Sequence, residues 1–552
     1  MWGVDMNHLK NKVTMIIGAA VILTLTGCGK SGSSGPSKLA DKQVINLTQN
    51  AEVTSVDVSK IFDKNSFNQM DAVGEGLFRY DANGKIHPAL ATKLTESKNG
   101  KTYWIALRKN GRWSNGDKVT AQNFVYSWQR AVNPKTASEY TYLFNGVKNA
   151  NAIVAGKKSV SSLGVKATDS YHLKIDLEHP IPYFKLILAR ETLYPLDQRI
   201  VDKYGSQYGT TSAKAVYNGP FVMQGWTGSN LSWKLVKNSH YWDKKHVYLK
   251  QINYQVSKEP STAYNMYQSG KLDMISLVGQ QAKQLKNNKN TVKRDLAALM
   301  YLQYNSKIKA LKNKDLRLAI SLSLNRNQLT RNILSDGSVP SKGLVPSKFV
   351  KDPNSGKDFA TAAYVKNTVD YNPTLAQSYW KKAQQEIGRK NMTFNLLCAD
   401  DDTTNYAVQF ISSQVEKNLK GLKLNIQKIP FKTMLTRTSE GQFQMNYIGW
   451  SADFADPITF LTLFTSNNSE NNGKWSNSTY DQLIKRSNTT DALKPKQRYQ
   501  DLIQADKILS ENQGVTPIYQ NNTTDLVNPK LKGVVYDKIN GHYDFKSARL
   551  VK

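Results

Sequence analysis

The chain has 552 residues, of which 39% are hydrophobic, so it can bury a large core and is longer than one compact domain usually is. Lys and Arg number 75 against 43 Asp and Glu, a formal net charge of +32 that suggests a nucleic-acid or an anionic-surface partner. The basic residues are dispersed, with no run of five or more and no nucleic-acid-binding motif, which argues against nucleic acid. We interpret the charge as a solvated face suited to a polyanionic cell wall.

The N-terminus predicts export. Two lysines precede an uncharged apolar stretch over residues 13–25, which is too short to span a bilayer comfortably and is typical of a signal peptide. It ends in Leu25-Thr26-Gly27-Cys28, which resembles the lipobox of bacterial lipoproteins and would make Cys28 the lipidated first residue of the mature chain. We expect residues 1–28 to be signal peptide and lipobox, and 29–40 a flexible tether. The expected location is the extracellular face of the cell membrane, through this lipid anchor.

A strand and an amphipathic helix are predicted between residues 101 and 132. Residues 101–107 alternate between apolar and polar, and Asn115-Gly116 supplies a tight-turn signal, which predicts a strand followed by a hairpin. Thr120 occupies an N-cap position, and the apolar residues over 121–132 follow helical spacing until Pro134 ends the pattern.

Later segments predict mixed α/β structure. Strands are expected over 171–177 and 231–235, and a helix over 375–387 that ends at Gly388. A strand up to Cys398, a helix over 404–419 and an alternating strand from Leu422 then follow in the order of a βαβ crossover. We interpret Cys398 as a buried strand thiol. It is the one cysteine left after lipidation, so no intramolecular disulfide is possible in the mature chain.

Patterns for catalysis or metal binding are weak. The seven histidines show no His-Glu-x-x-His or other ligand spacing, so no metal site and no cofactor are predicted, and His172 is expected to be a solvated surface residue. Asp400-Asp401-Asp402 lacks the spacing of a calcium loop and is interpreted as a solvated turn. No nucleophile elbow, P-loop or dinucleotide fingerprint occurs, and we expect no enzyme, although a triad assembled from remote residues stays open. The 28 tyrosines favour adaptable recognition.

Several segments resemble the oligopeptide-binding proteins of bacterial ABC importers, which belong to extracellular solute-binding protein family 5. The strongest runs from Trp113 to Asp117 and on through Val119 to Arg130. The resemblance covers about residues 44–551. Its other segments, in family order, are Tyr217–Phe221, Asn238–Trp242, Tyr267–Asp273, Asp315–Arg326 and Gly449-Trp450-Ser451-Ala452-Asp453-Phe454-Ala455-Asp456-Pro457.

The resemblance implies an α/β fold with a two-lobed clamp like that of type II periplasmic binding proteins, which closes on a ligand between its lobes. Lobe 1 is expected from residues 41–76 and 203–303 with a return over 521–552, an extra domain is inserted over 77–202, and lobe 2 covers 304–520.

The resemblance also implies a peptide site. Asp453 matches the family aspartate that pairs with the α-ammonium of the peptide, and a carboxylate suits this task because a buried cation must be neutralised and hydrogen-bonded. Gly449, Trp450 and Ser451 would line the same wall. Without the resemblance, the residues alone favour Asp453 as a cap of the following turn, before Pro457.

Two further positions are expected to line side-chain pockets, and two depart from the family pattern. Tyr140 and Phe431 match pocket positions, although either could be ordinary core. Where basic side chains of the family meet the C-terminal carboxylate of the ligand, this chain has Tyr447 and Thr404, which cannot form an ion pair. Arg437 could compensate. Without a charged stop, longer or variable peptides are expected.

The function implied is that of an extracellular receptor, not an enzyme, that captures oligopeptides and delivers them to an ABC permease and its ATPases. The chain is expected to be a monomer, without nucleic acid. Alternatives with the same fold are receptors for signalling peptides, for dipeptides or for non-peptide cargo. A secreted hydrolase and a wall-binding adhesin are alternatives of a different class.

Overall fold

The computed structural model describes residues 38–552, and residues 39–552 form one compact unit. The predicted signal peptide, Cys28 and the tether up to residue 37 lie outside the described residues, so these expectations stay predictions. Within residues 38–552, no helix is both long and apolar enough to cross a bilayer.

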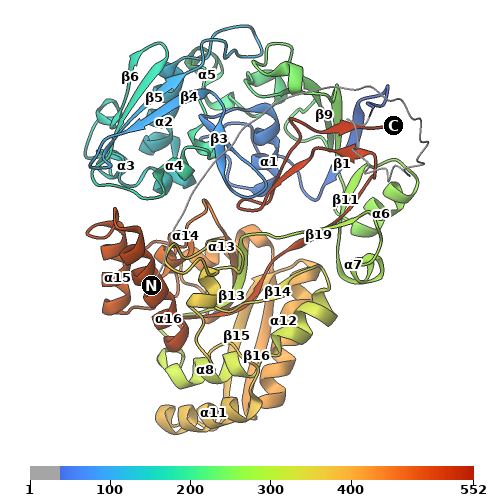
Figure 1. Cartoon of the computed structure of the whole chain (residues 1–552). Coiled ribbons are helices and arrows are strands. Elements are labelled where there is room, and N and C mark those ends of the chain that lie inside the picture. The colour runs from blue at the N-terminus through green and yellow to red at the C-terminus, as the bar shows by residue number, and fades with distance from the viewer. Residues whose placement is uncertain (1–37) are drawn as a thin grey trace, which may run out of the picture. The chain divides into compact units, whose positions relative to one another are not determined.

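A seven-stranded sheet brings together distant parts of the chain (Figure 1). Its central strand β1 pairs in parallel with β10 and β11, while β19, from near the C-terminus, lies between β11 and β12. The strands in spatial order are β12 (Thr291–Arg294), β19 (Thr523–Val527), β11 (Met274–Leu277), β1 (Val44–Gln49), β10 (Gln251–Val256), β9 (Ser232–Lys237) and β8 (Phe221–Gln224).

A four-stranded antiparallel sheet lies between β1 and β8 in sequence, within the range predicted for an inserted domain. The predicted strand over 101–107 is confirmed as β5, and the predicted helix is confirmed as α2 (Ala121–Val132). The Thr120 backbone N–H bonds the Asn123 side chain, and the apolar face of α2 is buried against the sheet core. The strands in spatial order are β4 (Ala91–Glu96), β5 (Thr102–Leu107), β7 (His172–Asp176) and β6 (Val165–Asp169).

A six-stranded sheet forms the core of the third part and confirms the predicted βαβ crossover. β15 and β16 pair in parallel over their whole length, and α12 (Asp402–Asn418) connects them. The predicted helix that ends at Gly388 is confirmed as α11 (Pro373–Ile387), and Cys398 is a buried strand thiol whose pKa burial raises to about 11. The strands in spatial order are β14 (Val339–Pro340), β18 (Val515–Gln520), β13 (Ala298–Tyr304), β17 (Met445–Ser451), β15 (Met392–Ala399) and β16 (Leu422–Ile429).

Helices and three two-stranded antiparallel sheets complete the unit. These sheets pair β2 (Phe78–Tyr80) with β3 (Ile86–Pro88), β20 (Leu531–Lys532) with β23 (Arg549–Leu550), and β21 (Val535–Asp537) with β22 (His542–Asp544). The remaining α-helices are α1 (Lys64–Val73), α3 (Ala150–Val154), α4 (Phe184–Ile187), α5 (Gln198–Tyr204), α6 (Pro260–Gln268), α7 (Gly279–Leu285), α8 (Lys314–Leu322), α9 (Arg326–Gln328), α10 (Phe359–Ala362), α13 (Phe431–Ser439), α14 (Ile458–Leu461), α15 (Ser478–Asn488) and α16 (Pro495–Asn512).

Two short links connect the seven-stranded and six-stranded sheets. Residues 295–297 lead from β12 to β13, and residues 521–522 lead from β18 back to β19 (Figure 1). The links are tied together, because the Leu296 N–H donates to Asn522 Oδ1 at 3.0 Å. The lobe boundary predicted at 303/304 falls inside β13, which pairs throughout in the six-stranded sheet, so the chain changes sheets several residues earlier.

Candidate functional site

Asp453 lies in the turn that follows β17 and is 7% exposed. The Tyr142 hydroxyl donates to its Oδ1 at 3.0 Å, and the Thr459 hydroxyl lies 3.4 Å from its Oδ2. The Asp453 backbone N–H in turn donates to Thr459 Oγ1 at 3.1 Å. The carboxylate is therefore held from two sides, by a tyrosine of the segment that carries the four-stranded sheet and by the first turn of α14.

Electrostatic forces on Asp453 oppose one another. Burial raises the pKa of this carboxyl above its ordinary value, while the charge of Arg190 and the hydrogen bonds from Tyr142 and Thr459 lower it. Burial likewise raises the pKa of Glu470, and the negative charge of Asp453 adds to that rise. The site is thus an acidic environment that an incoming cation would stabilise.

The turn that carries Asp453 is fixed by neighbours from other elements. Asp456 accepts two hydrogen bonds of 2.8 Å from the buried guanidinium of Arg498, on α16. The Phe454 ring stacks on Tyr183, with ring centroids 4.6 Å apart. Bidentate ion pairs and stacked rings restrict orientation, so Asp453 is held in place before any ligand arrives.

Strand β17 offers an unpaired edge next to Asp453. All seven residues of β17 pair with β13, but β15 pairs only with Met445 and Asn446, and no other described strand covers the rest of that edge. The Ala452 N–H donates to Ala297, so by alternation the backbone groups of Gly449 and Ser451 point toward the unpaired edge. An extended chain could therefore add to β17 as a further strand.

The three residues predicted to line this wall have different environments. Gly449 is required by packing, since a Cβ would lie 2.9 Å from the Leu299 carbonyl oxygen and closer still to the Met300 sulfur. Trp450 is partly buried, and its Nε1 has no hydrogen-bond partner among residues 38–552. Ser451 is exposed. No contact with a ligand tests these three assignments, so they stay predictions.

The two predicted pocket residues lie in contrasting positions. Tyr140 is half-buried, with its ring 5.2 Å from that of Phe67 and 5.5 Å from that of Tyr142. Phe431 starts α13 and is 59% exposed. Tyr140 therefore lies beside the tyrosine that holds Asp453, whereas Phe431 is a surface side chain available for contact.

The positions that depart from the family pattern carry no free charge. The Tyr447 hydroxyl is buried and lies 2.7 Å from that of Tyr519, and Thr404 is buried in the first turn of α12. Arg437 donates to the Gln442 carbonyl oxygen at the C-terminal end of α13, which engages the side chain suggested as a substitute.

Sequence analysis missed two residues next to Asp453. Tyr142 follows the predicted Tyr140 by two positions, and only its contact with Asp453 distinguishes them. Arg190, just before the 3₁₀ turn Glu191–Leu193, interacts electrostatically with Asp453, and no motif marks it. One sequence signal could have found Arg190. Arg190 and Glu191 are adjacent in an otherwise apolar stretch, and charged side chains in such a stretch need partners if they are buried.

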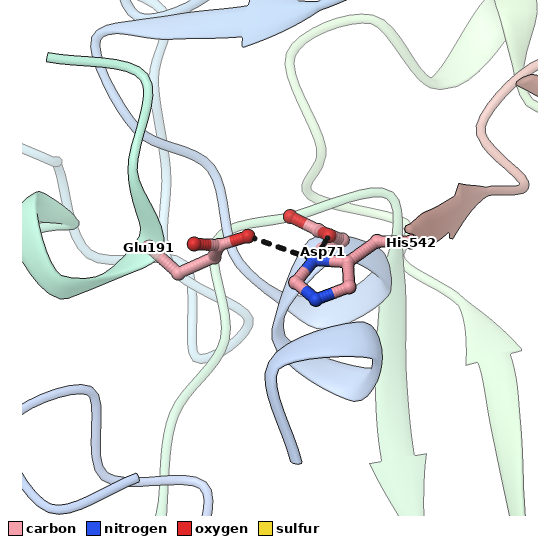
Figure 2. Close-up of side chains that lie close together, drawn as sticks. All are labelled: Asp71, Glu191 and His542. Carbon is pink, nitrogen blue, oxygen red and sulfur yellow. Dashed lines mark hydrogen bonds and ion pairs between the residues drawn. The ribbon is translucent and has the colours of Figure 1, made fainter. Parts of the chain in front are cut away.

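A second cluster of charged side chains joins three remote segments of the chain. Figure 2 shows His542 of β22 directed at Asp71 of α1 and at Glu191. Its Nδ1 lies 2.8 Å from Asp71 Oδ2 and 3.1 Å from Glu191 Oε1. Sequence analysis found no histidine with ligand spacing, because residues 71, 191 and 542 meet only in the folded chain.

The geometry of this cluster fits an ion pair better than a metal centre. The three candidate ligand atoms lie within 4.8 Å of one another, which a metal ion could bridge. However, two arginines already lie beside these ligand atoms. Arg190 Nε is 3.5 Å from Glu191 Oε2, and Arg79 donates to the backbone carbonyl oxygen of Asp71. Their positive charges would repel a divalent cation. Burial lowers the pKa of His542, but bonds to Asp71 and Glu191 outweigh it and raise this pKa to about 9. His542 is thus an imidazolium between two carboxylates.

Comparisons with known proteins agree on one family. The model for "Bacterial extracellular solute-binding proteins, family 5 Middle" matches residues 85–472. A Lactococcus lactis dipeptide-binding protein is 38% identical over 97% of this chain and 99% of its own length, and a Bacillus subtilis oligopeptide-binding protein is 31% identical over 95% and 96%.

Solved structures give the same result. The substrate-binding domain of an oligopeptide ABC transporter from Bacillus anthracis is similar, with a TM-score of 0.84 and 39% identity over 93% of this chain and all of that one. The peptide-bound oligopeptide-binding protein of Listeria monocytogenes has a TM-score of 0.83 and 35% identity, and the pheromone receptor PrgZ 0.83 and 37%, with the same coverage.

Proposed function

The chain belongs to the bacterial extracellular solute-binding proteins of family 5, which are two-lobed substrate-binding proteins and not enzymes, and from that premise we propose that it captures peptides and delivers them to an ABC permease. The observation that carries the proposal is a buried carboxylate, Asp453, beside the unpaired edge of β17. The carboxylate suits a peptide α-ammonium, and the strand edge suits a peptide backbone.

Each half of this arrangement contributes differently to recognition. A desolvated ammonium needs a charged acceptor, which Asp453 supplies in a fixed position. Main-chain groups are the same in every peptide, so pairing with the backbone of Gly449 and Ser451 gives affinity without a strict sequence preference. The expected cargo is therefore a class of peptides that share a free amine.

Delivery requires that the ligand change the conformation. We propose that the paired links 295–297 and 521–522 bend while the lobes close on the peptide, and that the closed form docks on the permease. The Tyr142 hydroxyl and Asp453 come from segments on different sheets, so a cation bound at Asp453 would favour their approach. A ligand drives closure only to the extent that it binds the closed state better.

Relatives leave the choice among peptide cargoes open. The Lactococcus relative is named for dipeptides, the Listeria structure holds a peptide, and PrgZ is a pheromone receptor. A relative from Escherichia coli is named as a probable deoxycholate-binding protein. Asp453 favours an amine over such an anionic, amine-free cargo, so peptides are the conclusion here.

Titration calorimetry with alanine peptides of two to five residues tests this function, after native mass spectrometry has shown any peptide carried through purification. We expect saturable binding that depends weakly on salt, because a desolvated site is screened much less than a surface. Binding that collapses with salt would support a wall-binding adhesin instead, and cleavage of the peptides would support a hydrolase.

We further propose that the mature chain is anchored outside the cell through Cys28. The support is the sequence Leu25-Thr26-Gly27-Cys28 after an apolar stretch, together with the extracellular setting of the family. Expression of the full chain should place it in the membrane fraction, and Cys28→Ala should lose the lipid from the N-terminal peptide seen by mass spectrometry. An unmodified Cys28 in the membrane-bound protein would contradict the anchor.

A further inference from the structure

Arg190 is a buried cation whose hydrogen-bonding capacity is largely unused. The residue is 4% exposed, and its Nε and Nη1 atoms are buried without a hydrogen-bond partner among residues 38–552. Its one ion-pair contact joins Nε to Glu191 Oε2 at 3.5 Å, and its guanidinium carbon lies 5.5 Å from the centre of the Phe67 ring. A guanidinium has five N–H donors, so this is an unusual environment for a buried arginine.

Glu191 meets Arg190 as a nearby charge and not through a hydrogen bond. Its Oε1 is engaged by the imidazolium of His542, which also binds Asp71, and its Oε2 lies 3.5 Å from Arg190 Nε without a hydrogen bond among residues 38–552. A buried carboxylate that served Arg190 would be expected to accept two parallel hydrogen bonds, as Asp456 does from Arg498. Arg498 therefore has a carboxylate that accepts from it with both oxygens. Among residues 38–552, Arg190 has no carboxylate bound in this way.

A chain of ring contacts connects Arg190 with the peptide site. The Arg190 guanidinium lies over Phe67, the Phe67 ring packs edge-on against Tyr140, and Tyr140 packs against Tyr142, the tyrosine that holds Asp453. The charge of Arg190 also interacts with those of Glu191 and Asp453. The site therefore combines the negative charge of Asp453, which suits an ammonium, with the positive charge of Arg190, which suits an anion. A zwitterion would give both charges a partner and leave the net charge of the buried region unchanged.

We propose that Arg190 binds a carboxylate of the cargo, while Asp453 binds its ammonium. The inference rests on the proposed peptide-binding function and narrows its substrate class to peptides that present a carboxylate near their N-terminal end. Two sources share this chemistry: the C-terminal carboxylate of a very short peptide, or an acidic side chain near the start of a longer one. Arg190 would then supply the charged group that Tyr447 and Thr404 cannot.

The test uses matched ligands on the full mature chain. Alanine peptides of two to five residues are titrated as free acids and as C-terminal amides, together with Ala-Glu-Ala-NH₂ and Ala-Gln-Ala-NH₂. In at least one of these ligand pairs we expect the uncharged member to bind about 30-fold or more weakly, because it cannot form the buried ion pair with Arg190. A difference between acid and amide at a single length identifies the main-chain carboxylate, and a difference between Glu and Gln identifies the side chain.

Arg190→Gln should reduce that ratio to within about threefold, whereas Arg112→Gln, which alters an exposed arginine bonded to the Gly116 carbonyl oxygen, should preserve it. Ratios near one in the wild-type chain for every pair, with peptides still bound, would overturn the role of Arg190 and leave the proposed function intact. A ratio unchanged in a folded Arg190→Gln chain would also overturn it. Absence of all peptide binding would instead remove the proposed function. Should Arg190→Gln fail to fold, the wild-type ratios still decide the chemistry.

Discussion

Asp453→Asn is expected to weaken the binding of a free-amine peptide by about 2–5 kcal/mol, because the ammonium would be buried without a countercharge. The substitution keeps the shape of the side chain, and the amide oxygen can still accept from the Tyr142 hydroxyl. Asp453 is 7% exposed, so water can replace little of the lost charge. The loss should appear in peptide affinity and not in the stability of the fold.

Calorimetry with alanine tripeptide and its N-acetyl derivative separates the charge effect from other causes. The acetyl derivative lacks the ammonium, so it should bind the wild-type chain weakly. Its affinity should fall little further when Asp453 is replaced by Asn. Asp506→Asn is the matched control, since Asp506 is buried in α16, accepts from the Leu344 N–H and lies outside the proposed site. Unchanged affinity of the tripeptide for Asp453→Asn would remove Asp453 from the site.

The stability of the folded chain is expected to decrease as pH rises from about 6.5 to 9, by an amount on the order of 3 kcal/mol from His542 alone. The pKa of His542 is raised from its ordinary 6.5 to about 9, so in this range the folded chain holds a proton that the unfolded chain has lost. This contribution is fully present below pH 6.5 and is lost as pH rises through about 9. Burial and the charge of Glu191 also raise the pKa of Asp71, which acts in the same direction at lower pH.

Denaturant unfolding at pH 6.5, 7.5 and 9 measures this dependence. His542→Gln should flatten it, because glutamine can donate to Asp71 or Glu191 but does not titrate. His172→Gln is the control, since the His172 side chain is exposed and its ring Nδ1 lies 2.7 Å from the exposed Asp169 carboxylate. The role assigned to His542 would be wrong if its variant kept the full pH dependence. Glu191 has a depressed pKa, because Arg190 and His542 outweigh its burial, so its contribution is lost only in acid and does not affect this range.

Local sequence patterns predicted several elements correctly because they depend on neighbours a few residues apart. The helix over 121–132 and the helix that ends at Gly388 were recoverable from periodicity and from their end signals. The βαβ unit around Cys398 followed from the order of its patterns, since parallel strands need a crossover. The resemblance selected Asp453, and the structure adds that it follows directly after strand β17.

The same patterns could not select between near neighbours at the site. Tyr140 and Tyr142 are equivalent as sequence, and only the hydroxyl contact with Asp453 distinguishes them. Phe431 matches a pocket position of the family, yet its side chain is 59% exposed at the start of α13. Helical periodicity does not show whether another segment packs over the first residue of a helix. Burial of a single side chain depends on what packs over it, which is a long-range property.

By itself, the sequence determined the mixed α/β class, the family and the absence of a charged side chain at 404 and 447. Only the tertiary structure decided which charges share a buried region. His542 joins Asp71 and Glu191, and Arg190 has buried donors without acceptors in the part of the chain that the structure describes, because residues far apart in the sequence are brought into a low-dielectric interior. In such an interior the energy of a charge depends on its spatial neighbours, which local periodicity does not encode.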